Sequence, residues 1–145
     1  MILSISIYLF YYIYIYRLKI FFASALDMCF KIYDKNFKLI ESIRHLERSI
    51  LNIAYSMNKG LLIISGANGV SCWRIYRTNN NSNNKHHDDP IHYVIEKMFQ
   101  FANCQEWISN LVYDEKNDKI FGMRENSIYV FSLGTRMLDT TLGKL

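Results

Sequence analysis

Metal-binding side chains gather in one stretch of this sequence, residues 85–92, which reads KHHDDPIH. Histidine and aspartate side chains supply the imidazole and carboxylate groups that bind zinc or nickel. A metal site also needs a rigid surrounding shell that orients its ligands. The overlapping segment 78–90 reads TNNNSNNKHHDDP and contains no apolar side chain that would hold it in place. We therefore interpret 78–90 as a flexible, solvated loop and expect no metal ion.

A second group of acids, Asp114, Glu115 and Asp118, has a spacing that is similar to that of a calcium-binding loop. Such a loop also needs a central glycine and a bidentate glutamate at its twelfth position, and both are missing here. The segment aligns with a plain turn elsewhere in the chain. We therefore expect a turn and no calcium site.

Catalytic motifs are absent from the sequence. His45 is a candidate base, but no serine, cysteine or carboxylate accompanies it in a recognisable catalytic order. Neither a phosphate-binding glycine loop nor the GxSxG and HExxH motifs occur. The sequence predicts a protein that is not an enzyme and that has no cofactor.

Composition narrows the function further. The 145 residues suffice for about one ordinary domain, and 50% are hydrophobic, which allows a packed core. The net charge of +4 is dispersed, so a nucleic-acid surface is not indicated. Trp73 and the tyrosines and phenylalanines alternate along the expected strands, which favours core packing over base stacking. Cys29, Cys72 and Cys104 are odd in number and widely spaced, which favours reduced, intracellular thiols.

The strongest pattern is an internal repeat. Residues 50–75 align with 108–133 without a gap, at an offset of 58. The identical pairs are Ile50 and Ile108, Asn52 and Asn110, Tyr55 and Tyr113, and Asn68 and Asn126. Each copy predicts three short strands, over 50–56, 61–65 and 70–76, and again over 108–114, 120–123 and 128–133. The dipeptide Asn68-Gly69 predicts a hairpin, while 39–51 shows an ambiguous helical periodicity.

The repeat period indicates the architecture. Without the loop 78–90, the offset falls to the mid-40s, and Tyr33 precedes Trp73 by 40 residues. A period of about 40–45 residues with four short strands is that of a β-propeller blade.

At these positions the chain resembles the WD40-repeat (WD-repeat) family. Trp73 stands where the family has its tryptophan, with Tyr33 and Phe131 as aromatic replacements. His45 precedes the strand 50–56 at nearly the spacing of the family's histidine. Three residues fall where the family has the aspartate of a tight turn: Asp27, Asn68 and Asn126.

The chain also departs from this pattern. No glycine precedes His45, and Arg74 and Ser132 replace the aspartate that ends the repeat, so the family's Trp–Ser–His–Asp network is incomplete. The resemblance implies an all-β fold over 18–145, a partial WD40-like propeller of about two full blades plus partial blades. It implies a non-catalytic scaffold that binds proteins or peptides but not nucleic acid. We expect a fragment of a larger, cytoplasmic propeller protein, of a ciliary or cytoskeletal kind, that needs further blades or another chain to close.

The N-terminal segment 1–17 is open to several interpretations. Its first 16 residues carry no charge, whereas a membrane-spanning helix needs about 20 apolar residues. The segment is either an anchor or signal, a β-strand, or translated non-coding sequence. As an anchor, it would leave Arg17 and Lys19 on the cytosolic side, which gives the alternative of a membrane-tethered interaction subunit. We expect a soluble parent protein.

Overall fold

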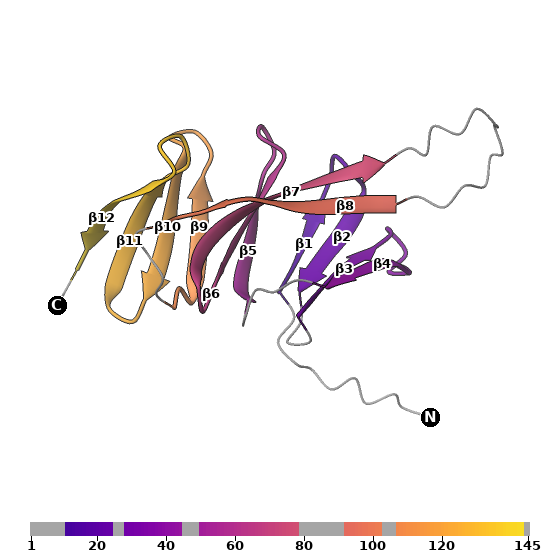
Figure 1. Ribbon diagram of the computed structural model, residues 1–145, viewed down its shortest axis with the longest axis horizontal. Coiled ribbons are helices and arrows are strands. Elements are labelled where there is room, and N and C mark those ends of the chain that lie inside the picture. The colour runs from indigo at the N-terminus through magenta and orange to yellow at the C-terminus, as the bar shows by residue number, and fades with distance from the viewer. Residues whose placement is uncertain (1–10, 25–27, 45–49, 79–91, 103–106, 144–145) are drawn as a thin grey trace, which may run out of the picture.

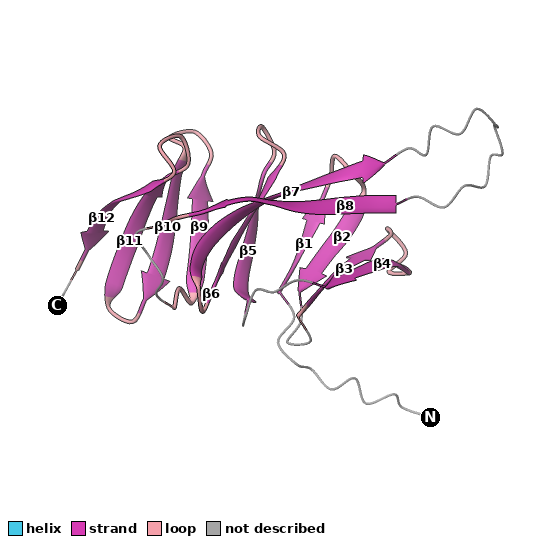
Figure 2. Cartoon of the chain, in the orientation of Figure 1, coloured by secondary structure: helices cyan, strands magenta, loops and turns pink. Residues whose placement is uncertain are grey.

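The computed structural model describes residues 11–24, 28–44, 50–78, 92–102 and 107–143. These residues form twelve β-strands in three four-stranded antiparallel meanders, which lie side by side (Figures 1 and 2). Sheet A consists of β1 (Tyr11–Ile15), β2 (Ile20–Ser24), β3 (Cys29–Tyr33) and β4 (Leu39–Arg44). Sheet B consists of β5 (Ile50–Ser56), β6 (Leu61–Gly66), β7 (Gly69–Thr78) and β8 (His92–Gln100). Sheet C consists of β9 (Asn110–Asp114), β10 (Lys119–Arg124), β11 (Ser127–Ser132) and β12 (Met137–Leu142).

The first hairpin has the same geometry in all three sheets. Its two strands are joined by a four-residue turn over 16–19, 57–60 or 115–118. The last turn residue is left-handed each time, with φ of 56° at Lys19, 64° at Gly60 and 57° at Asp118. Because strand pairing and turn geometry agree, residues of the three sheets correspond one to one along this hairpin.

Two apolar cores lie between the sheets. The first face of sheets B and C is the one turned toward the preceding sheet in the chain, and the second face is the opposite one. In sheet A, the second face is turned toward sheet B and the first face points outward. The A–B core contains Phe22, Phe30 and Ile32 of sheet A and Leu62, Trp73 and Ile75 of sheet B. The B–C core contains Leu61, Ile63 and Cys72 of sheet B and Ile108, Ile120 and Phe131 of sheet C. Strand β6 is buried along its whole length because both of its faces contact a neighbouring sheet.

The hairpin of β7 and β8 is the longest in the structure and reaches past β6 beside sheet A (Figure 1). Ile75 and Tyr93 of this extension are buried in the A–B core. The backbone N–H of Tyr93 donates a hydrogen bond to Glu41 Oε2 on β4, over 2.9 Å. The extension therefore connects the outer strand of sheet B to that of sheet A.

The structure decides several points that the sequence left open. Residues 39–44, within the segment of ambiguous periodicity, form strand β4, and the expected two full blades plus partial blades are three four-stranded sheets. The third is sheet A, whose first strand β1 lies inside the hydrophobic segment 1–17. The described part of the chain contains no helix with the length and apolarity that a membrane span requires. Residues 79–91 lie outside the described ranges, so the expectation of a flexible loop remains untested.

Candidate functional site

The three aromatic positions of the repeat, Tyr33, Trp73 and Phe131, correspond in the structure. Each lies on the third strand of its sheet, directly after a shift in the pairing with the fourth strand. Trp73 is 8% exposed in the A–B core and Phe131 is 0% exposed in the B–C core. Tyr33 is half-buried, because it lies on the first face of sheet A, which no described sheet covers.

Trp73 is held by local contacts. Its indole Nε1–H donates to Ser71 Oγ over 2.8 Å, and its ring meets Phe30 edge-on at 5.2 Å between centroids. Ser65 is buried, and its Oγ has no hydrogen-bond partner within the described residues. The indole of Trp73 therefore donates its hydrogen bond to Ser71, a serine of its own strand, and not to Ser65. His45 and Asp27, the other members expected from the resemblance, lie outside the described residues.

Asn68 and Asn126 occupy corresponding turns between the second and third strands. The flanking pairs are Gly66 with Gly69, and Arg124 with Ser127. The carbonyl oxygen of Asn68 accepts a hydrogen bond from Gln100 Nε2. Gly69 has φ of 84°, a conformation that glycine adopts without strain. The expected hairpin at 68–69 is confirmed.

A pair of asparagines joins sheets B and C. Asn52 Nδ2 donates to Asn110 Oδ1 over 2.7 Å, and these residues correspond in the repeat. The Oδ1 of each also accepts a bond from the next backbone amide, Ile53 N at 2.8 Å and Leu111 N at 3.2 Å. The B–C seam, meaning the junction between these sheets, therefore contains a polar contact between repeat-equivalent side chains.

Two carboxylates of the β9–β10 turn, Glu115 and Asp118, close the B–C seam at its rim. The carboxylate of Glu115 accepts hydrogen bonds from Ser56 Oγ at 3.1 Å and from the backbone N–H of Asn58 at 2.7 Å. The carboxylate of Asp118 accepts hydrogen bonds from Lys59 Nζ and from Tyr113 OH, each at 2.9 Å. Burial acts to raise the pKa of Asp118, but the hydrogen bonds from Lys59 and Tyr113 outweigh it, and the pKa is lowered. The turn expected at Glu115–Lys119 is confirmed over 115–118, and its acids accept hydrogen bonds from three side chains and one backbone amide.

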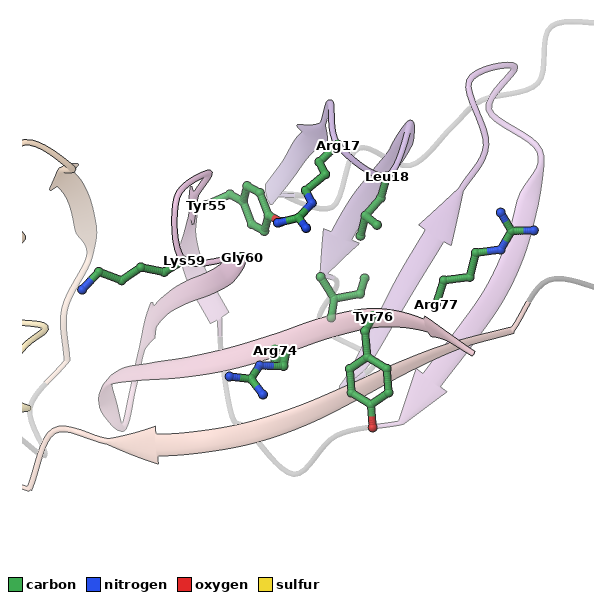
Figure 3. A pocket seen from close by; sticks show the side chains of 9 residues that line it. Arg17, Leu18, Tyr55, Lys59, Gly60, Arg74, Tyr76 and Arg77 are labelled. Carbon is green, nitrogen blue, oxygen red and sulfur yellow. The ribbon is translucent and has the colours of Figure 1, made fainter. Parts of the chain in front are cut away.

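The A–B seam is open where the B–C seam is closed. Met57 and Gly60 of sheet B stand at the turn positions that Glu115 and Asp118 occupy in sheet C. A pocket of about 300 Å³ lies at this seam (Figure 3). It is lined by Arg17 and Leu18 of sheet A and by Tyr55, Lys59, Gly60, Arg74, Ile75, Tyr76 and Arg77 of sheet B.

The pocket is cationic. The side chains of Arg17, Arg74 and Arg77 are exposed and form no ion pair or hydrogen bond with any other described residue. Lys59 extends away from the pocket, toward its partner Asp118 (Figure 3). The Arg17 guanidinium lies beside the Tyr55 ring (Figure 3). Burial raises the pKa of Tyr55, and the charge of Arg17 partly opposes this rise.

Both end sheets carry apolar residues on their outward faces. On the second face of sheet C, Val112 is 63% exposed, and Met123 and Ile128 are also exposed. On the sheet A side, Phe37 is 69% exposed and stacks on Phe21 with 4.4 Å between ring centroids. Apolar side chains grouped on an exposed face are uncommon on protein surfaces that contact only water.

The structure offers little reactive chemistry. The buried thiol of Cys72 has a pKa raised to about 12, mainly by burial, so it stays protonated and unreactive at neutral pH. The described residues contain no cluster of His, Cys, Asp or Glu able to hold a metal ion. Most of the candidate metal segment 85–92 is not described, and His92 begins β8. Sequence reasoning missed the cationic pocket, although the alignment of Gly60 with Asp118 was its visible signal.

Comparison with known proteins gives a structural relative. No family model and no curated protein sequence matches the chain. Among solved structures, it resembles the β-propeller domain of Cps50 (Swd1) from Myceliophteria thermophila, with a TM-score of 0.65 and 14% sequence identity. The match covers 92% of this chain and 40% of that chain, so the present chain spans less than half of that propeller. The fold of the chain is therefore a partial β-propeller, with three four-stranded blades.

Proposed function

We propose that this chain is part of a non-catalytic WD-repeat scaffold that binds proteins. The observation that carries the proposal is the pair of end faces that no described sheet covers, of which the second face of sheet C repeats the apolar row that sheet B buries against sheet C. WD-repeat character is supported by the repeat itself and by the corresponding positions of Tyr33, Trp73 and Phe131.

The second faces of sheets B and C correspond residue by residue. Ile63 pairs with Ala54 and Cys72 across sheet B, and all three pack in the B–C core. The corresponding row of sheet C is Val112, Phe121 and Val130. This row is apolar, like the one that sheet B buries against sheet C. The second face of sheet C therefore suits the first face of a further four-stranded sheet, whose binding would remove apolar surface from water.

A photo-crosslinking residue in place of Val112, introduced into the natural gene product, tests this proposal. We expect crosslinks to a β-sheet polypeptide, either another segment of the same protein or a second chain, identified by mass spectrometry. The same residue in place of exposed Lys116, on the β9–β10 turn, is the matched control and should give far fewer such crosslinks. Equal labelling at both positions, or crosslinks from position 112 to lipid alone, would contradict the proposal.

Rigid blades present their turns as a surface on which partners are recognised. We propose a cytoplasmic scaffold of the ciliary or cytoskeletal kind, supported by the aromatic replacements at Tyr33 and Phe131. Imaging of the tagged natural protein tests this location, and exclusive labelling of another compartment would refute it.

A further inference from the structure

The two seams differ at one pair of corresponding residues. In sheet C, the Asp118 carboxylate accepts hydrogen bonds from Tyr113 OH and from Lys59 Nζ. In sheet B, the position of Asp118 is taken by Gly60, which has the same left-handed backbone, and that of Tyr113 by Tyr55. A Cβ atom built on Gly60 would have the Tyr55 hydroxyl as its nearest neighbour, at 3.8 Å. The A–B seam thus keeps the tyrosine donor but lacks the carboxylate.

The donor groups near Gly60 have no acceptor among the described residues. The Tyr55 hydroxyl forms no hydrogen bond within the described residues, and Arg17 and Arg74 form no ion pair there. Glu96 faces Arg74 across the β7–β8 register, but the described side chains do not pair. The Arg17 guanidinium and the Tyr55 hydroxyl therefore lie together at the A–B seam with no acceptor among the described residues, whereas the Arg74 side chain leaves β7 on the opposite face, beside Leu61.

We propose that this pocket binds the carboxylate of a glutamate or aspartate side chain in an acidic peptide, at the position that Asp118 fills in the B–C seam. The inference rests on the proposed protein-binding function, because that function supplies a peptide as the carrier of the carboxylate. A guanidinium group matches the planar carboxylate with two parallel hydrogen bonds. The volume of about 300 Å³ is at the small end for ligand pockets and suits one side chain better than a larger molecule.

Neighbouring residues favour a peptide over a free ion. Leu18 and Ile75 line the pocket with apolar surface that contacts the aliphatic part of an acidic side chain. Arg77 pairs with Tyr93 in the β7–β8 register, so its side chain leaves β7 on the same face as Ile75, and it lines the pocket where a second acidic residue of the peptide would pair with it. The recognised chemistry is therefore a peptide with closely spaced carboxylates.

Titration of the full 145-residue chain with blocked peptides tests the inference. The probes are acetyl-Gly-Glu-Glu-Gly-amide and its glutamine counterpart, with binding followed by NMR at the Tyr55 ring. We expect the glutamate peptide to bind and the glutamine peptide not to bind. Arg17→Gln should weaken binding about tenfold or more, the value of one charge-assisted hydrogen bond. Lys116→Gln removes a charge at the corresponding turn position of sheet C and should leave binding nearly unchanged.

Gly60→Asp gives the sharpest variant, because it supplies the missing carboxylate from the chain itself. Asp118 already adopts this backbone conformation, so aspartate is compatible with it. We expect Gly60→Asp to abolish peptide binding, and the neutral, equally large Gly60→Asn to reduce it much less. Equal losses in both variants would show that bulk alone blocks the pocket and would overturn the inference.

Three further results would also overturn it. These are no binding of the glutamate peptide, an equal loss in Arg17→Gln and Lys116→Gln, and tighter binding of inorganic phosphate than of the peptide. Failure here leaves the proposed scaffold function intact, because crosslinking at position 112 measures a different face of the molecule. Conversely, failure of the crosslinking test would not decide whether the pocket binds the peptide, because the Arg17→Gln and Gly60→Asp variants test that binding directly.

Discussion

The side-chain nitrogen of Asn52 lies 2.7 Å from the side-chain oxygen of Asn110, its counterpart in the internal repeat. The two residues occupy the same place on the first strands of adjacent sheets, so the contact joins two copies of one position. Both also bind the following backbone amide of their own strand. The pair therefore fixes the local backbone and the relative placement of sheets B and C together.

A double-mutant cycle on Asn52 and Asn110 measures how much their contact contributes to the stability of the B–C seam. Asn52→Ala and Asn110→Ala should each lower the free energy of unfolding by about 1 kcal/mol, because each removes the exposed bond between the two side chains and a part-buried bond to the following backbone amide. The double variant should lose less than the sum, with a coupling of about 0.5 kcal/mol or more. Urea unfolding gives the values, and strict additivity would show that the contact does not contribute.

Trp73→Ala should destabilise the protein by roughly 3–5 kcal/mol, because it removes a buried ring from the A–B core and leaves a cavity. Trp107, which is 49% exposed, provides the control, and Trp107→Ala should change stability by about 0.5 kcal/mol or less. Chemical denaturation of both variants makes the comparison. Similar losses would mean that Trp73 does not have the structural role assigned to it.

Gly122→Ala should cost about 1–3 kcal/mol through overpacking of the B–C core. A Cβ atom at this position would lie 2.9 Å from Ile108 Cγ2 and 3.2 Å from a ring carbon of Phe131. At Gly134, the nearest atom to an added Cβ is Asp118 Oδ2 at an ordinary 3.5 Å, so Gly134→Ala serves as the control. Thermal melting distinguishes the two, and an unchanged melting temperature for Gly122→Ala would rule out this close packing.

Acid should weaken the B–C rim. Because the pKa of Asp118 is lower in the folded state, its stabilising contribution is present above the unfolded pKa of about 3.9 and is lost as the pH falls through the folded pKa. The stability difference between the natural protein and Asp118→Asn should thus be constant near neutral pH and shrink below about pH 4. Salt should reduce it as well, since the Lys59–Asp118 pair is partly exposed. A difference that grows on acidification would contradict this assignment.

The segment 79–91 should be dispensable for folding. Thr78 and His92 pair directly at the end of the β7–β8 hairpin, so an Asn-Gly turn has the geometry to join them. Because closure entropy changes slowly with loop length, replacing 79–91 by Asn-Gly should alter stability by about 1 kcal/mol or less. Denaturant unfolding tests the expectation. The same variant should bind no less zinc than the natural chain, and loss of a stoichiometric zinc ion would establish a metal site in the loop.

Local sequence patterns were enough to locate most strands of sheets B and C. The repeat alignment and the turn at Asn68-Gly69 depend on neighbours in the chain, and the structure follows them closely. Sheet A was harder to predict because its first strands lie in a run of apolar and aromatic residues without polar alternation. The ambiguous periodicity of 39–51 was resolved by pairing with β3, which makes 39–44 a strand. Pairing across a sheet overrides such weak local preferences.

The sequence by itself determined the repeat, its short strands and the apolar positions that form the two cores, because these depend on period and side-chain class. Only the tertiary structure decided which residues meet across the seams, since a seam joins turns about 40 or 58 residues apart. The same turn position holds Asp118 at one seam and Gly60 at the other. The carboxylate of Asp118 neutralises and closes the B–C seam, whereas the lack of a side chain at Gly60 leaves the A–B seam open and positively charged.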